Sequence, residues 1–244
     1  MVYGATGSSK NSNRFNRYFM NKLLFCLLVL CCSLCARAQG TFRNLNFGLN
    51  QVPTSTPPGS SVLITQALPF WSGVIGGVPQ SSVLYNNTNG PLIPAISLVS
   101  PDSPVGQIFP GEYEAFLSAG SGPASSIAQT GQFPASASTI QFVALGRPQF
   151  WELTINGVNI PVYEQSQAYL GWRLYQGDIS AFAGQTGELA FSALNVNGSV
   201  GTMSLTDIQF VSVPEPLSLS LILVGSLIGW WRCKPGQSER VKAK

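Results

Sequence analysis

Six carboxylates in the middle of the chain are the side chains that could perform acid–base chemistry. A glycosidase needs two carboxyl groups about 5–9.5 Å apart. The chain contains no histidine, and the residues between Gln39 and Val213 contain no cysteine. Serine and cysteine hydrolases of the usual histidine-dependent kind are therefore excluded. The carboxylates that remain as candidates are Glu112, Glu114, Glu152, Glu164, Asp178 and Asp207.

Two of these carboxylates, Glu112 and Glu114, alternate with Tyr113. On a strand they would share one face, and we expect that face to be solvated. Asp178 is expected to be the N-cap of a single helical turn that ends at Gly184. Asp207 could ligate calcium together with backbone carbonyl groups, but no cluster of acidic residues surrounds it in the sequence. We therefore expect no resident metal or cofactor, with calcium at Asp207 as the alternative.

A group of aromatic residues near Arg173 is the candidate ligand-binding surface. Sugar sites combine apolar ring surfaces with a few polar groups, and Tyr169, Trp172 and Tyr175 flank the arginine. Aromatic rings also fill the core of β-sandwiches, and that alternative stays open.

Charge is distributed unevenly along the chain. The net charge is +3, but the residues between Gln39 and Val213 include eight acidic residues, three arginines and no lysine. This body therefore carries a net charge of about −5. Nucleic-acid binding depends on clustered lysine and arginine, so we expect no nucleic-acid partner.

The body, residues 39–212, has the composition of an all-β protein. Turn-forming residues recur every 8–12 positions, which predicts an antiparallel β-sandwich of many short strands. Residues 61–67 are one predicted strand. Asn156-Gly157 predicts a hairpin in which Ile155 faces Val158, Leu153 faces Ile160 and Trp151 faces Val162. The last strand is predicted at residues 203–211, with a bulge near Thr206 and Asp207, because Leu205 is out of phase with Ile208 and Phe210.

Residues 111–211 resemble the jelly-roll domains of the galactose-binding-like superfamily. The resemblance rests on residues 129–143, the Asn156-Gly157 hairpin, the segment DISAFAGQTGELAF and the closing TDIQF. It implies a jelly-roll-like sandwich. Many members of that superfamily bind carbohydrate and some bind calcium, although a fold does not determine a function.

The first 38 residues have the order of a secretory signal peptide. Met20-Asn21-Lys22 supplies the positive region, residues 23–34 the apolar region, and Ala36-Arg37-Ala38 the small-x-small cleavage site. Residues 1–19 are either an extended positive region, or translation begins at Met20. We expect export through the secretory route.

The chain ends in a second targeting pattern, residues 213–244. Pro214-Glu215-Pro216 precedes the uncharged run 217–231, which closes with Trp230 and Trp231 and is followed by Arg232 and Lys234. Fifteen helical residues span about 22 Å, less than the roughly 30 Å of a bilayer core. Flanking aromatic and basic residues are typical of a membrane interface, so we expect a short transmembrane helix.

This order resembles the PEP-CTERM sorting signal of bacterial proteins associated with exopolysaccharide. The resemblance implies cleavage near the motif by an exosortase, a membrane protease. Here Cys233 interrupts the basic cluster and the tail continues to Lys244. We expect a non-catalytic protein, anchored in the inner membrane and then placed at the cell surface or in the extracellular matrix with polysaccharide as a partner. The alternatives are a carboxylate-dependent glycan-active enzyme and a plain tail-anchored protein.

Overall fold

The computed structural model describes residues 40–87, 93–103 and 109–212. Nearly all of them belong to one compact unit, which ends at Val211. The expected signal peptide (1–38) and the expected sorting signal (213–244, with its helix 217–231) lie outside the described residues. Among the residues that are described, no helix has the length and apolar character needed to cross a membrane.

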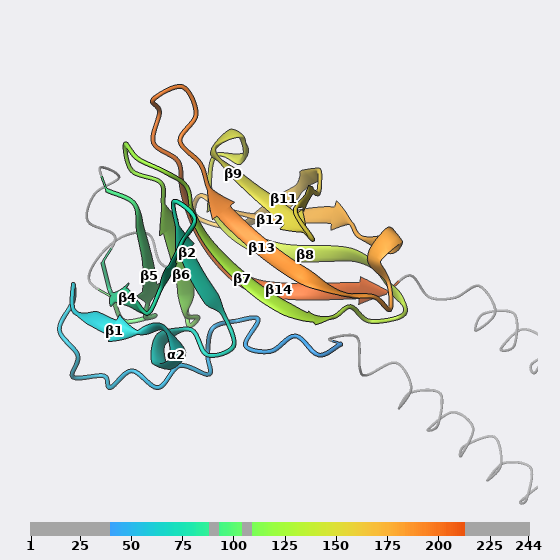
Figure 1. Cartoon of the computed structure of the whole chain (residues 1–244). Coiled ribbons are helices and arrows are strands. Elements are labelled where there is room, and N and C mark those ends of the chain that lie inside the picture. The colour runs from blue at the N-terminus through green and yellow to red at the C-terminus, as the bar shows by residue number, and fades with distance from the viewer. Residues whose placement is uncertain (1–39, 88–92, 104–108, 213–244) are drawn as a thin grey trace, which may run out of the picture. The chain divides into compact units, whose positions relative to one another are not determined.

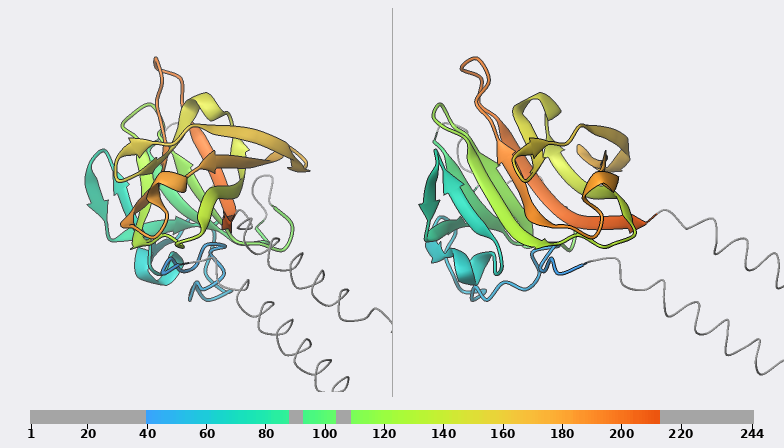
Figure 2. Two further views of the ribbon diagram at one scale, coloured as in Figure 1. Left: turned by 90° about the vertical axis from the view of Figure 1, so that its right-hand side faces the viewer. Right: turned by 45° about the vertical axis from the view of Figure 1, so that its right-hand side comes forward.

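The body is a two-sheet β-sandwich, as the sequence predicts (Figures 1 and 2). The first sheet contains, in spatial order, β1 (Ser61–Leu63), β4 (Ser82–Tyr85), β5 (Ala95–Val99), β6 (Glu114–Ser118), β14 (Thr202–Ser212), β8 (Ala137–Gly146), β12 (Trp172–Asp178) and β11 (Val162–Tyr169). The second contains β10 (Val158–Asn159), β9 (Trp151–Ile155), β13 (Thr186–Ala193), β7 (Ser125–Gln132), β2 (Ser72–Ile75) and β3 (Val78–Gln80). Short helical turns add α2 (Ile64–Ala67), η1 (Pro148–Phe150) and η2 (Ser180–Phe182).

The core lies between the two sheets and follows from the alternation of side chains along their strands. On β13, Leu189, Phe191 and Ala193 are fully buried, and they follow one another at the two-residue period of a strand face. Leu153 and Ile155 of β9 pair across from this strand and are buried with it. The alternation along β13 in the sequence thus correctly predicts which of its faces is buried.

The Asn156-Gly157 hairpin is confirmed at its tip and ends sooner than predicted. Ile155 pairs with Val158, and the N–H of Ile160 donates to the carbonyl of Leu153. Both turn residues have positive φ, as a type I′ turn requires. The predicted pair of Trp151 with Val162 is wrong, because Val162 pairs with Gly177 in the other sheet. Pro161 has no N–H to continue the ladder, so the chain leaves one sheet for the other at this residue.

Two further predictions need correction. Residues 61–67 form a strand only as far as Leu63, and the rest is the helical turn α2. The sheets are also not wholly antiparallel, because β4 and β5 run parallel. The single helical turn predicted after Asp178 is present as η2, and Gly184 has φ +72°. The predicted N-cap is wrong by one residue: Ile179 holds that position without a side-chain cap, and Asp178 Oδ1 accepts the N–H of Ser180.

The predicted bulge in the last strand is confirmed by its backbone conformation. Asp207 has φ +50°, a left-handed conformation that is uncommon outside glycine. Leu205 and Ile208 are both buried in the core although they are three residues apart. The left-handed residue between them therefore changes which positions of β14 face inward.

Candidate functional site

The segment of residues 40–47 covers the places where two strands lose a neighbour. β2 pairs with β7 only as far as Ala128, and β6 pairs with β14 only as far as Leu205. Beyond those points, the N–H of Thr41 donates to the carbonyl of Gln132, and the N–H of Ile208 donates to the carbonyl of Leu45. The segment thus links the C-terminal ends of one strand from each sheet.

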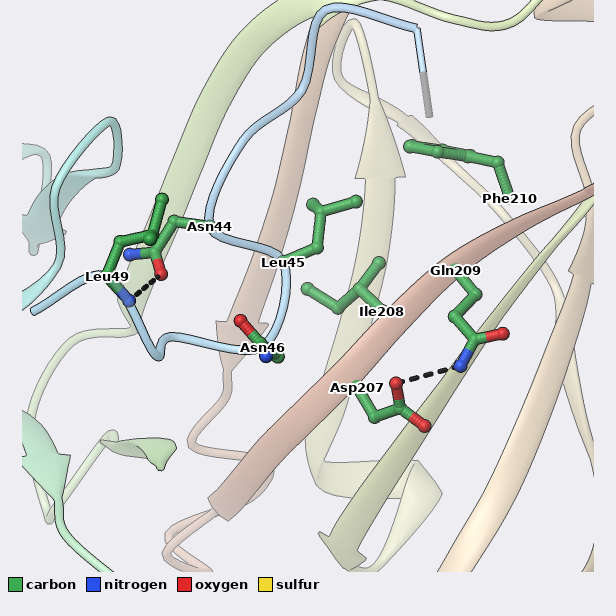
Figure 3. Close-up of a pocket in the computed structure, with 8 residues that line it drawn as sticks. All are labelled: Asn44, Leu45, Asn46, Leu49, Asp207, Ile208, Gln209 and Phe210. Carbon is green, nitrogen blue, oxygen red and sulfur yellow. Dashed lines mark hydrogen bonds between the residues drawn. The ribbon is translucent and has the colours of Figure 1, made fainter. Parts of the chain in front are cut away.

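A pocket of about 460 Å³ lies where this segment meets the bulge of β14 (Figure 3). Its size falls in the range of small-molecule sites. One side is the loop of residues 44–49, and the other side is the strand from Asp207 to Phe210. The lining residues are Asn44, Leu45, Asn46, Leu49, Asp207, Ile208, Gln209 and Phe210.

Hydrogen bonds within the lining orient its polar side chains. Gln209 Nε2 donates to Asp207 Oδ1 at 2.8 Å. On the loop, Asn44 Oδ1 accepts the N–H of Leu49 at 2.9 Å, and Asn46 Oδ1 accepts the N–H of Gly48 at 3.2 Å. The second Asp207 oxygen and part of each amide group remain as hydrogen-bonding positions of the lining (Figure 3).

The loop side of the pocket is held by contacts with two buried side chains. Gln129 of β7 accepts the N–H of Arg43 and donates to the carbonyl of the same residue. Trp71 Nε1 donates to the carbonyl of Asn44 at 3.1 Å. The Trp71 ring also packs against Phe47 and Phe191, with centroids 5.6 Å and 6.5 Å apart. The pocket wall is therefore connected to the core rather than being a free loop.

Several residues in or near this pocket have a left-handed backbone conformation. Seven described residues other than glycine have positive φ, and Asn44, Phe47 and Asp207 are three of them. A fourth, Phe70, follows Pro69, whose carbonyl accepts the Asn44 Nδ2 donor at 3.2 Å. Asparagine and aspartate tolerate this conformation, but phenylalanine does so only under constraint from its surroundings. Such residues concentrate at functional sites, and here they mark the pocket.

The chemistry of the lining is that of hydrogen bonding to an uncharged polar ligand. Asp207 is the one carboxylate of the lining, and no basic side chain belongs to it. Glycoside hydrolysis needs a second carboxyl group across the scissile bond. The described residues also hold no group of three or more histidine, cysteine or acidic side chains. Calcium at Asp207 therefore stays a prediction that rests on one carboxylate.

The predicted aromatic surface divides between three environments. Trp172 and Tyr175 are three positions apart on β12, so they point to opposite faces of the sheet, and both are buried. Their burial matches the alternative that the sequence left open, in which the aromatic rings are packed inside the protein. Tyr175 packs on Phe142 and Trp151 in the core. The ring of Trp172 lies against Phe109.

Tyr169 and Arg173 are the members of that group with exposed surface. The Tyr169 ring meets the edge of Phe109, with 6.4 Å between centroids. The guanidinium of Arg173 forms an ion pair with Glu164 at 2.9 Å. A ligand role for Tyr169 and Arg173 stays a prediction.

The solvated face predicted for Glu112 and Glu114 is wrong. The strand β6 begins at Glu114, so Glu112 lies before it. Glu114 is 2% exposed, and its side chain accepts hydrogen bonds from the backbone of Phe109 and the hydroxyl of Ser204. Burial raises the pKa of the Glu114 carboxyl from 4.5 to about 8, and the two hydrogen bonds offset part of that rise. The side chain is therefore neutral at pH 7.

Two of the other candidate carboxylates, Glu164 and Asp178, have partners close by in the structure. Glu164 is paired with Arg173. The N–H and the hydroxyl of Ser180 hold the pKa of Asp178 below its usual value. Glu152 lies on β9 opposite Ser192 of β13.

Sequence reasoning found Asp207 and missed the loop that faces it. The stretch Asn44-Leu45-Asn46 is the signal that was available, since alternating asparagines beside an unassigned segment indicate turns with exposed amide groups. Gln209 was part of the predicted last strand. The residues around Phe70 in the sequence do not indicate its left-handed conformation.

Comparison with solved structures gives a weak similarity. No protein-family model matches the chain, and no curated protein matches its sequence. Among solved structures, the chain is similar to a carbohydrate-binding module, TmCBM61, in complex with β-1,4-galactotriose. The identity is 12% and the TM-score is 0.37, over 72% of this chain and 99% of that chain. The function of this chain therefore has to follow from its own site.

Proposed function

We propose that this chain is an exported, surface-sorted protein whose jelly-roll-like body binds neutral carbohydrate without catalysing a reaction. The observation that carries the binding role is the polar pocket between residues 44–49 and the bulge of β14. Its amide groups and its single carboxylate can donate to and accept from the paired hydroxyls of a sugar. Leu49, the exposed apolar member of the lining, offers surface for the C–H groups of the same ring, whereas Leu45 and Ile208 are buried beneath it.

The charge of the pocket favours an uncharged ligand. Asp207 would repel the carboxylate of an acidic sugar, because the lining holds no arginine or lysine to compensate for it. The net charge of about −5 on the body has the same effect at longer range. A neutral hexose is therefore a better ligand than a uronic acid.

The sequence patterns at the two ends of the chain support the proposed export and surface location. The pattern of residues 20–38 supports export, and Pro214-Glu215-Pro216 with the apolar run 217–231 supports handling by an exosortase-type membrane protease. In this proposal the inner membrane holds the chain until it is cut. The product then resides at the cell surface or in the extracellular matrix beside polysaccharide, with no nucleic-acid partner.

Calorimetric titration tests the binding role. The full-length protein, purified in detergent, is titrated with cellotriose, maltotriose and β-1,4-galactotriose. At least one should bind, and Asp207→Gly combined with Gln209→Ala should abolish that binding, because glycine keeps the left-handed conformation at position 207. Asp178→Ala removes an exposed carboxylate that is not part of the pocket lining and is the matched control. Binding that survives the double substitution, or no binding by the wild-type protein, refutes the role of the pocket.

Mass spectrometry of the mature protein tests the sorting role. The product isolated from its native cells should lack Lys244 and end close to Glu215. Substitution of Glu215 by Ala should leave the full-length chain in the membrane. An intact Lys244 in the mature wild-type protein would instead identify a plain tail-anchored protein.

A further inference from the structure

Two asparagine–glycine turns of the described structure have nearly the same backbone conformation. Asn156 and Gly157 have φ values of +51° and +75°, and Asn197 and Gly198 have φ values of +53° and +78°. All four residues are exposed, and each turn joins two paired segments of a hairpin. The second turn lies in the loop between β13 and β14, which extends beyond the strands that it connects (Figure 1). Since the backbones match, the two asparagines differ in what surrounds their side chains.

The side-chain amide of Asn156 is held against β13. Its Oδ1 accepts the N–H of Glu188 at 2.8 Å. The amide also lies over Gly187, where an added Cβ would come within 2.7 Å of Asn156 Oδ1 and 2.8 Å of its Nδ2. This close approach needs a residue without a side chain. Movement of the amide toward the nitrogen of Gly157 would break the hydrogen bond to β13.

The side-chain amide of Asn197 has no such support. It makes no hydrogen bond within the described part of the chain. Its turn is closed by two backbone hydrogen bonds between Val196 and Ser199, with lengths of 3.1 and 2.9 Å. A Cβ added at Gly198 would meet no atom within 4 Å. The Asn197 amide is therefore free to rotate toward the nitrogen of Gly198, and no neighbouring group restricts access to that turn.

We propose that Asn197 is a site of spontaneous deamidation, whereas the fold protects Asn156 in the same dipeptide. The backbone nitrogen of Gly198 loses its proton and bonds to Cγ of Asn197, while the bond from Cγ to Nδ2 breaks and ammonia leaves with that proton. Water then opens the cyclic imide: attack at Cγ gives aspartate, and attack at the backbone carbonyl carbon gives isoaspartate. Asparagine is a thermolabile residue, and glycine presents the least hindered backbone nitrogen because it has no side chain.

Either product changes the loop between β13 and β14. Both add one negative charge. Isoaspartate also directs the main chain through the side-chain carbons, which lengthens the turn by one carbon atom. The pairing of Val196 with Ser199 depends on a two-residue turn, so this product loses it. The pocket is lined by other residues, and the inference does not depend on the proposed function.

Peptide mass spectrometry of the full-length protein, aged in mildly alkaline buffer, tests the proposal. Cleavage after acidic residues yields peptides 153–164 and 189–207, which each contain one of the turns. Peptide 189–207 should gain the mass difference between a carboxyl and an amide group about three- to tenfold faster than peptide 153–164, because the hydrogen bond of Asn156 must break first. In urea, which removes the fold, the two rates should become similar. Asn197→Gly keeps a residue that accepts positive φ and should abolish the change in peptide 189–207.

The substitution Gly187→Ala is the matched variant for Asn156. Its methyl group displaces the Asn156 amide, which is the flexible end of a side chain, so Asn156 should then react about as fast as Asn197. The rate at Asn197 should stay the same and serves as the control. An Asn156 that still reacts slowly in this variant would show that the contact with β13 does not protect it.

The wild-type protein decides the matter even if Gly187→Ala does not fold. Equal rates at the two asparagines in the native protein overturn the proposal, as does a faster reaction at Asn156. An Asn197 that reacts in urea but not in the native protein overturns it too.

Discussion

Trp71 donates the N–H of its indole ring to the carbonyl oxygen of Asn44, 27 positions earlier in the chain. This bond joins a buried aromatic residue of the core to a residue that lines the pocket. Asn44 in turn holds Leu49 and Pro69 through its side-chain amide. The conformation of the pocket wall therefore depends on the packing of the sandwich beneath it.

Replacement of Trp71 by Phe should weaken both the fold and the pocket. The ring contacts with Phe47 and Phe191 are largely retained, but the carbonyl of Asn44 loses its donor in a buried place. An unsatisfied buried group costs about 1–3 kcal/mol. Urea unfolding followed by fluorescence should show a loss of that size. Tyr163→Phe, at an exposed position, should change stability by less than about 0.5 kcal/mol, and an equal effect of the two substitutions would contradict this assignment.

The side chain of Gln129 is expected to hold residues 40–47 against β7. Its two hydrogen bonds to the backbone of Arg43 have lengths of 2.6 and 2.9 Å. Gln129→Ala should cost about 1–3 kcal/mol in the free energy of unfolding and should lower ligand affinity, because the loop wall is then less ordered. Gln176→Ala removes a glutamine pair on the surface of the first sheet and serves as the control. A Gln129→Ala protein with wild-type stability and affinity would show that the segment is held by other contacts.

A series of substitutions at Asp207 should separate its effect on backbone conformation from its contact with the ligand. Asparagine tolerates the left-handed conformation, so Asp207→Asn should keep its stability and its affinity for a neutral sugar. Glycine also accepts it, and Asp207→Gly should keep stability but lose affinity. Alanine is strained at φ +50°, so Asp207→Ala should lose both. Thermal melting with calorimetric titration measures the two quantities, and a large loss of affinity in Asp207→Asn would indicate that the charge itself is needed.

Glu114 should make the stability of the protein fall as pH rises. The folded state raises the pKa of this carboxyl from 4.5 to about 8, so it retains a proton that the unfolded chain releases. The contribution to stability is complete below pH 4.5 and is lost as pH rises through 8. A rise of this size corresponds to at most about 4–5 kcal/mol. Glu114→Gln remains neutral at every pH and should unfold with a flatter dependence on pH.

Urea unfolding at pH 5, 7 and 9 measures this dependence. The wild-type protein should lose stability relative to Glu114→Gln between pH 5 and 9. Glu188→Gln, at an exposed position of β13, should keep the wild-type profile. Parallel curves for wild type and Glu114→Gln would show that another group governs the pH dependence.

Local patterns in the sequence predict the parts of this fold that depend on neighbouring residues. The turn at Asn156-Gly157 follows from the need for positive φ at two adjacent positions. The bulge at Asp207 follows from a phase change between Leu205 and Ile208, which is visible in the sequence as a broken alternation. The hydrogen bond from the N–H of Ser180 to Asp178 is of the same kind. Each of these features is determined within a few residues of the chain.

Features that depend on distant partners are not visible in those patterns. Trp172 and Tyr175 each have one polar neighbour in the sequence, Arg173 and Gln176, but only strand pairing decides that each ring is covered. The burial of Glu114 likewise depends on Ser204 and Phe109 rather than on its neighbours. Residues 40–47 show no strand period in the sequence, and their backbone hydrogen bonds go to Gln132 of β7 and Ile208 of β14, which are distant in the chain. The sequence indicated Asp207 only as a calcium candidate, which stays a prediction, and it predicted neither the pocket nor its opposite wall.

The most direct test of the pocket is hydrogen–deuterium exchange of the full-length protein with and without a saturating trisaccharide. The account predicts slower exchange in two separate peptides, one covering residues 44–49 and the other covering residues 207–210, with little change on β11 and β12. The same protection should be absent in the Asp207→Gly, Gln209→Ala double variant. Protection confined to the region of Tyr169 and Arg173, or no protection in a protein that binds the sugar, would contradict it.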